Sequence, residues 1–170
     1  MSDIKTEKLH ARLKVRGIQI SGGADFAKMV PWTRLTFSLC TAIAALATAF
    51  ACTTTLWLMV PVALLGATRP RHPFDYIFNR FIRSQVGTIA LPHNTAPTRF
   101  ACGIAAVWFV VMALLFHSGY DVAGYILGAI FVFVGALVSI THLCIPGIIY
   151  QFLFGDRSLI KTSIFGGARV

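Results

Sequence analysis

Long apolar runs alternate with short basic segments along this chain. Charged side chains are absent from Leu35–Thr68, Phe100–Tyr120 and Val122–Gly155. A helix needs about 20 mostly apolar residues to cross the ~30 Å hydrocarbon core of a bilayer, and each run reaches or exceeds that length. The pattern therefore predicts an all-α, polytopic membrane protein.

The first run is too long for a single crossing. As one helix, Leu35–Thr68 would extend about 50 Å at 1.5 Å per residue. Lys and Arg residues flank it on both sides, and cytoplasmic segments of membrane proteins are rich in these residues. Both flanks are therefore expected on the cytoplasmic side, which requires an even number of crossings. We predict a hairpin of two helices, 32–50 and 53–68.

The same reasoning predicts a second hairpin. Its helices cover 99–117 and 122–145, and the turn between them contains no Lys or Arg. All fifteen Lys and Arg residues, including those in the tail 156–170, then fall on one side of the membrane. The membrane domain 31–155 is thus expected to contain four transmembrane helices, with both termini in the cytoplasm.

Two polar segments complete the organisation. Residues 1–30 form a basic cytoplasmic arm, in which the alternation over Leu13–Ile20 suits either a short strand or a loosely ordered arm that docks on a partner. Residues 73–84 place apolar side chains on one helical face and arginines on the other. This segment is expected to lie in the membrane interface as an amphipathic helix, or else to cap the inner end of the bundle.

The net charge of +9 comes from an excess of Lys and Arg over Asp and Glu. In a soluble protein such an excess would indicate nucleic-acid binding. Here the basic residues flank apolar runs, as expected beside anionic lipid headgroups. We therefore expect no nucleic-acid partner, and we expect headgroup contacts from four arginines: Arg69, Arg71, Arg80 and Arg83.

One face of the fourth predicted helix carries small residues. Gly124, Gly128, Gly135, Ser139 and His142 fall within a single arc of a helical wheel. A Gly-x-x-x-Gly spacing permits close approach of another helix backbone. This face is expected to pack against a helix, either of this chain or of a partner subunit.

His142 admits two interpretations, because an ionisable side chain in a membrane helix suggests a function. A neutral imidazole can form a hydrogen bond across a helix pair, or it can be an axial ligand for haem or a chlorin. No other cofactor is predicted. No metal site is expected either, because no second histidine or carboxylate lies at ligand spacing.

Three motifs, "RPRHPFDYIFNRF", "APTRFACGI" and "LCIPGIIYQFL", carry a family resemblance. Over roughly residues 25–155 the chain resembles the bacterial membrane family known as domain of unknown function 4395, which implies the bacterial inner membrane. That family typically ends in Cys-x-x-Cys-x-x-Tyr. Cys144 and Tyr150 match this ending, whereas Gly147 stands in place of the second cysteine.

The missing cysteine bears on redox chemistry. Thiol–disulfide exchange uses one sulfur to attack and a second to resolve the mixed disulfide, and Cys144 has no such partner nearby in sequence. Cys102 is expected near the same membrane face and is a candidate partner. The alternative is that both are structural, since free cysteines often serve as small apolar residues.

The sequence contains no recognisable catalytic constellation. We find no phosphate loop, no paired carboxylates and no charged residue in the interior of the predicted spans. These observations favour a non-catalytic accessory or assembly subunit of a larger bacterial membrane complex, with other membrane proteins as partners. The alternatives are a membrane thiol- or sulfur-handling protein using Cys144, possibly with Cys102, and a haem- or chlorin-binding subunit using His142.

Overall fold

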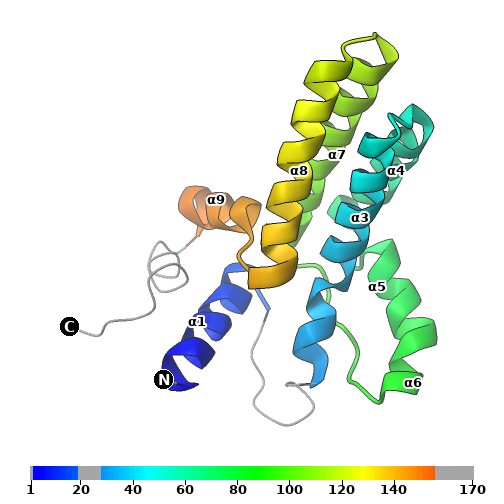
Figure 1. The fold of residues 1–170 in the computed structure, drawn as a ribbon. Coiled ribbons are helices and arrows are strands. Elements are labelled where there is room, and N and C mark those ends of the chain that lie inside the picture. Colours follow the sequence, from blue (N-terminus) through cyan, green and yellow to red (C-terminus); the bar gives the residue numbers. More distant parts are fainter. Residues whose placement is uncertain (1, 19–27, 156–170) are drawn as a thin grey trace.

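The computed structural model describes residues 2–18 and 28–155, which form helices joined by short loops (Figure 1). No strand occurs in these two ranges, so the all-α prediction is confirmed for them. The elements in chain order are α1 (Ser2–Val15), η1 (Val30–Arg34), α3 (Leu35–Ala49), α4 (Thr53–Thr68), α5 (Pro73–Ile77), η2 (Phe78–Ile82), α6 (Arg83–Val86), α7 (Ala96–His117), α8 (Asp121–Thr141) and α9 (Ile145–Phe154).

Two helical hairpins, α3–α4 and α7–α8, form the bundle (Figure 1). They pack chiefly across the hairpins, α4 against α7 and α3 against α8. Alanines occupy many of the contact positions, which lets the helix backbones approach closely. The central core is formed by Ala44, Ala47, Leu56, Met59, Ala63, Ala106, Phe109, Met112, Ala113 and Phe116.

Three described helical segments are long and apolar enough to cross a membrane, namely Val30–Ala49, Ala96–His117 and Asp121–Thr141. This indicates a membrane protein. The remaining bundle helix, α4, is shorter at 16 residues and contains Pro61. Its bounds agree with the predicted second helix, and α7 begins three residues earlier than predicted, at Ala96, because Pro97 is well tolerated in the first helical turn.

The fourth helix ends earlier than the predicted 145. α8 stops at Thr141, and His142 caps it with a left-handed backbone at φ +58°. Pro146 has no backbone N–H and cannot continue the preceding helix, but it fits the first turn of α9. His142 therefore lies just outside the helix in which it was expected.

The N-terminal arm contains a helix, α1, instead of the expected strand or loose arm. It packs on the chain itself rather than extending away. The Gln151 amide on α9 donates to the Val15 carbonyl at 3.3 Å, and the Arg12 guanidinium donates to the Thr141 carbonyl at 2.6 Å. Residues 19–20 of the predicted alternation, and the tail 156–170, lie outside the described residues.

The segment predicted as a helix over 73–84 is helical to Val86 and includes a π-helical turn at η2. Its apolar side chains divide into two groups. Phe78 is completely buried, 5.0 Å from the ring of Trp32, whereas Tyr76 and Phe81 are largely exposed. The segment therefore both caps the bundle and presents apolar side chains outward.

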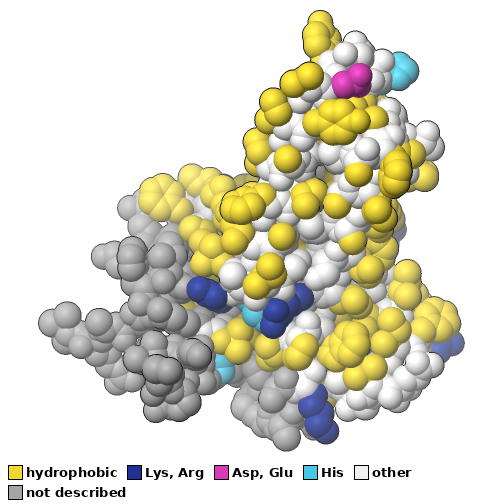
Figure 2. All heavy atoms as spheres, viewed as in Figure 1, with side chains coloured by type: hydrophobic (Ala, Val, Ile, Leu, Met, Phe, Trp, Pro, Cys, Tyr) yellow, Lys and Arg dark blue, Asp and Glu magenta, His cyan; other side chains and the backbone are white. Residues whose placement is uncertain are grey.

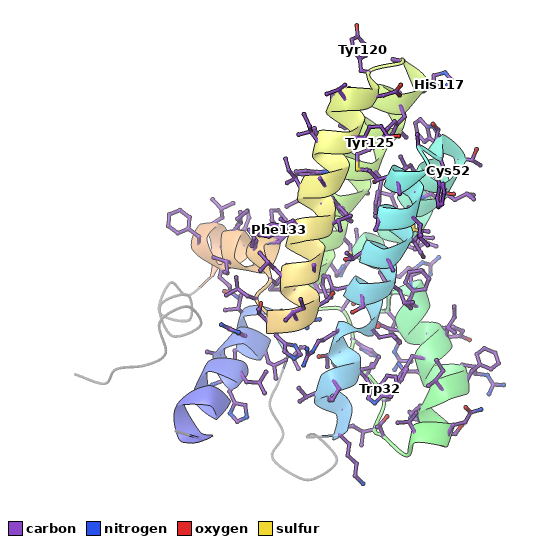
Figure 3. The ribbon with its side chains drawn as sticks, in the orientation of Figure 1. Trp32, Cys52, His117, Tyr120, Tyr125 and Phe133 are labelled. Carbon is purple, nitrogen blue, oxygen red and sulfur yellow. The ribbon has the colours of Figure 1, made fainter. Side chains whose placement is uncertain are left out.

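The two ends of the bundle differ in charge. Dark-blue Lys and Arg side chains lie around the lower half in Figure 2, where α3, α4 and α7 meet the loops. We call this the basic end; Arg34, Arg69, Arg71 and Arg99 belong to it. Figure 3 shows His117 and Tyr120 at the opposite tip, in the α7–α8 turn, and Cys52 in the α3–α4 turn.

Candidate functional site

A cavity of about 130 Å³ lies near the basic end of the bundle, where the end of α1 meets α3, α5, α7 and α8. Most of its wall is apolar, including Phe37, Phe109 and Phe131. Several polar or sulfur-containing side chains also line it, namely Arg16, Thr36, Cys40, His72, Asp75, Cys102 and Cys144.

Arg16 places a buried positive charge in this wall. Its side chain is 4% exposed, one terminal nitrogen (Nη2) donates to the Thr33 carbonyl at 2.9 Å, and its guanidinium carbon lies 4.7 Å from the ring centre of Phe37. Among the described residues, Nε and Nη1 have no hydrogen-bond partner. Burial lowers the Arg16 pKa, yet a guanidinium retains its proton in proteins. The cavity wall therefore contains a cation with two nitrogens whose N–H groups have no hydrogen-bond partner among the described residues.

The end of α1 holds Arg16 in place. Gly17 has φ +76°, a conformation that favours glycine, and a Cβ there would lie 2.8 Å from Thr95 side-chain atoms. The Thr95 hydroxyl donates to the Arg16 carbonyl, and the Thr98 hydroxyl donates to the same oxygen at 3.4 Å. These contacts tie the arm to the first turn of α7 and direct the guanidinium inward.

Asp75 contributes a carboxyl group to the same cavity. The hydroxyl of Thr36 on α3 donates to its Oδ1. Burial raises the Asp75 pKa, while the Thr36 hydrogen bond and the charges of Arg16 and Arg71 act in the opposite direction. In the described part of the chain Asp75 forms no direct ion pair with either arginine.

Two cysteines from distant parts of the sequence meet this cavity. Cys102 lies near the start of α7, Cys144 caps the start of α9, and both are buried. Burial raises the Cys144 pKa more strongly than the charge of Arg16 lowers it. Because the thiolate is the nucleophile, this thiol is a poor nucleophile at neutral pH. Cys52 lies at the opposite end of the bundle (Figure 3).

His72 lies behind Cys102. A Cβ placed on Gly66 would lie 3.0 Å from both the Cys102 sulfur and the His72 Nε2, so glycine there lets α4 approach both groups. The imidazole is 2% exposed, and its burial lowers the pKa of His72 to about 4. His72 is therefore neutral at physiological pH and adds no charge to the cavity.

The predicted glycine face is covered within the chain. A Cβ added at Gly128 would overlap Thr48, one at Gly135 would overlap Thr41, and one at Gly124 would lie 2.9 Å from the Phe116 ring. Ser139 donates to the Gly135 carbonyl of its own helix at 2.8 Å. α3 thus covers most of the glycine face, for which a helix of a partner subunit was one of the two candidates.

His142 is buried near the cavity but does not line it. Neither ring nitrogen has a hydrogen-bond partner among the described residues. Burial, with help from Arg34, Arg16 and Arg12, lowers the pKa of His142 to about 4, so the ring is neutral. The described residues contain no group of three or more His, Cys, Asp or Glu that would suit a metal ion.

The arginines expected at lipid headgroups divide by exposure. Arg69, Arg80 and Arg83 are exposed. Arg71 is half-buried, and its Nε has no hydrogen-bond partner in the described ranges. Arg71 therefore faces partly toward Asp75, which its charge influences.

Sequence reasoning identified Cys102 and Cys144 but missed Arg16, His72 and Asp75. Arg16 was one basic residue among several in the arm. Asp75 had a sufficient local explanation, because an acidic residue stabilises the first turn of a helix. The sequence nevertheless distinguishes Asp75, because Asp75 and Asp121 are the only acidic residues between Lys28 and Gly155.

Comparison with known proteins gives one match. The family model described as Domain of unknown function (DUF4395) matches residues 30–154. No curated protein and no solved structure matches the chain. Asp75, Cys102 and Cys144 lie within the matched segment, and Arg16 lies before it. Because the match spans most of the sequence, the chain belongs to the DUF4395 family, as its motifs predict.

Proposed function

We propose that this protein is a membrane sulfur-handling protein that binds a small sulfur-containing anion in the cavity at its basic end. One observation carries the proposal: the buried Arg16, with two nitrogens that have no hydrogen-bond partner among the described residues, lines the same cavity as Cys102 and Cys144. A buried N–H without a partner costs about 1–3 kcal/mol, and more on a charged group. An anion that accepts from both donors would remove that cost.

The composition of the wall supports a particular class of ligand. One guanidinium favours an ion with a single negative charge. The remaining wall is aromatic, aliphatic and thiol-bearing, which suits a soft and polarisable sulfur atom better than a strongly hydrated oxyanion. A small monovalent sulfur anion satisfies both conditions.

The proposed activity is binding of the anion rather than covalent chemistry on it. Burial keeps the Cys144 thiol protonated, and the protonated form does not attack a disulfide. Cys144 and Cys102 therefore act as sulfur contacts for the ligand. Gly147 supplies no second thiol next to Cys144, in agreement with this role.

The proposal places four helices across a bacterial inner membrane with both termini in the cytoplasm. α4 would complete the fourth crossing with help from flanking residues. The exposed Phe81 and Phe154 belong to short helices, α5–α6 and α9, on different sides of the basic end (Figure 1). Both segments would lie in the membrane interface, with Arg80 and Arg83 at the level of the phosphates.

The accessory-subunit hypothesis stays a prediction, but the glycine face and the N-terminal arm, which motivated it, both pack against other helices of this chain. α3 covers the glycine face, and α1 packs against α9. The proteins that co-purify in mild detergent test that hypothesis. The haem or chlorin hypothesis for His142 also stays a prediction, which an absorption spectrum of the purified protein tests.

Binding of radiolabelled thiocyanate, measured by equilibrium dialysis in mild detergent, tests the proposed function. Thiocyanate is a monovalent sulfur anion that does not titrate near neutral pH. We expect saturable binding that weakens at least about tenfold in Arg16→Met, the cost of one charged hydrogen bond. The exposed Arg80→Met is the matched control and should bind normally.

Nitrate, a monovalent anion without sulfur, tests the contribution of the thiols. Nitrate should displace the radiolabelled thiocyanate less well than unlabelled thiocyanate does. In Cys102→Ser or Cys144→Ser, the affinities for the two anions should differ less than in the unmodified protein. Circular dichroism and size-exclusion chromatography would establish that each variant is folded. Equal binding by Arg16→Met and the unmodified protein would refute the proposal.

A further inference from the structure

Arg16 and Asp75 face one cavity with opposite charges but without a direct ion pair between the described side chains. When Asp75 is ionised, the two groups sum to zero and the cavity offers little net attraction to an anion. When Asp75 is protonated, the cavity carries one net positive charge. The protonation state of a single carboxyl group therefore decides whether the cavity is suited to an anion.

We propose that binding of the anion at Arg16 is coupled to the uptake of one proton by Asp75. The inference rests on the proposed function and adds its regulation by pH. The bound anion brings a second negative charge into the enclosed site, and like charges in a poorly solvated site disfavour ionisation of the carboxyl group. By linkage, the proton and the anion must each increase the affinity for the other by the same factor.

Among the described residues that line the cavity, Asp75 is the one carboxyl group, and the imidazole of His93, from the loop between α6 and α7, also lines it. Arg16 from α1 and Arg71 from the loop before α5 remain protonated. His72, in the same loop, is neutral because its pKa is about 4. Cys40 from α3 and Cys102 from α7 line the cavity as thiols.

The position of the carboxyl group supports the coupling. Burial raises the Asp75 pKa and so brings its titration closer to neutral pH than that of an exposed aspartate. The Thr36 hydroxyl donates to Oδ1, and the His72 backbone also donates to this carboxyl group, so both contacts hold it at the cavity wall. The proton and the anion together form a neutral pair, which costs less to bury than the anion alone.

The experiment measures protons and anions together. Saturating thiocyanate is added to the detergent-solubilised protein in weakly buffered solution, and the pH change is recorded beside the dialysis measurement. We expect uptake of up to one proton per bound anion. Affinity should fall by up to tenfold per pH unit between the Asp75 pKa of the free protein and the higher Asp75 pKa of the complex.

Asp75→Asn is the informative variant, because an amide oxygen still accepts the Thr36 hydrogen bond while the group cannot titrate. It should bind thiocyanate without proton uptake and with an affinity that does not change with pH. Asp121→Asn, at the other end of the bundle, is the matched control and should behave as the unmodified protein. Infrared difference spectra of the unmodified protein should also gain a protonated-carboxyl band when thiocyanate binds.

The outcomes separate the two proposals. Thiocyanate binding without proton uptake would overturn the coupling and leave the proposed function intact. Proton uptake that persists in a folded Asp75→Asn variant would also overturn it, since another group would then carry the proton. If the variant does not fold, the infrared band decides, and its absence would refute the coupling. Absence of binding at every pH would remove the proposed function and the coupling with it.

Discussion

The contact between α8 and α3 at Gly128 yields a prediction whose size follows from the structure. An alanine Cβ at this position would lie 2.6 Å from the Thr48 hydroxyl oxygen and 3.0 Å from the Thr48 Cβ. The Thr48 hydroxyl donates to the Ala44 carbonyl at 2.8 Å, which holds its side chain in place. Gly128→Ala therefore forces either a new Thr48 rotamer or a wider separation of the two helices.

Three contributions determine the expected change. Loss of the Thr48 hydrogen bond costs about 1 kcal/mol, and overpacking costs about 1–3 kcal/mol. Replacing a helical glycine with alanine returns about 1 kcal/mol. The net expectation is a loss of about 1–3 kcal/mol in the free energy of unfolding.

Gly103 on α7 provides the control. A Cβ there would meet no atom within 4 Å, so Gly103→Ala should gain about 1 kcal/mol from helix propensity alone. Thr48→Ala combined with Gly128→Ala removes the overlapping hydroxyl and methyl groups and should recover much of the loss, giving a favourable coupling energy.

The assay is denaturant unfolding of detergent-solubilised protein, followed by circular dichroism, for the unmodified chain, the three variants above and Thr48→Ala alone. Equal stability of Gly128→Ala and Gly103→Ala would show that α3 does not pack at Gly128, and the reasoning would fail. The contact at Gly128 also limits a test of the accessory-subunit hypothesis. Because a large side chain at Gly128 would disrupt the chain's own bundle, loss of a complex in Gly128→Leu would not identify a partner-binding face.

Three further predictions concern the backbone, the sulfur pair and the histidines. Ala51 has φ +45°, which costs an L-residue about 1–2 kcal/mol, so Ala51→Gly should raise thermal stability; a lower melting temperature would contradict this. A Cβ at Gly147 would lie 3.3 Å from the Cys144 Cβ, slightly closer than the roughly 3.5–4.5 Å of disulfides. After a small shift Gly147→Cys should therefore lose two titratable thiols on mild oxidation, and an unchanged thiol count would exclude the pairing. Burial lowers the pKa of His72 to about 4, so the unfolded chain binds the proton more readily than the folded chain. The free energy of unfolding should be full above about pH 6.5 and should fall by up to about 1.4 kcal/mol per pH unit toward pH 4. His72→Gln should make this fall less steep, whereas an equally steep fall in the variant would point to other groups.

The candidate site shows which inferences local sequence supports. Cys102 and Cys144 were expected at one end because the distribution of Lys and Arg, which follows from membrane topology, placed both helix ends on the same side. Their common cavity was not predictable in the same way. Cys144 lies beyond the end of α8, and its placement depends on the left-handed turn at His142 and on the start of α9.

By itself, the sequence determined the helical class, the two hairpins and the family, because apolar length, basic flanks and local motifs depend on neighbouring residues and on the bilayer. Tertiary structure alone decided that α3 covers the glycine face and that α1 folds back to bring Arg16 beside Asp75. The whole first hairpin lies between these two residues in the sequence. Each also has an adequate local role, Arg16 as a basic residue at the membrane interface and Asp75 as an acidic residue in the first turn of a helix. The packing of α1 against α9 and the start of α7 buries Arg16, while α3 contacts the half-buried Asp75 through Thr36. Both side chains then line one cavity, where desolvation gives them a significance that their sequence positions do not carry.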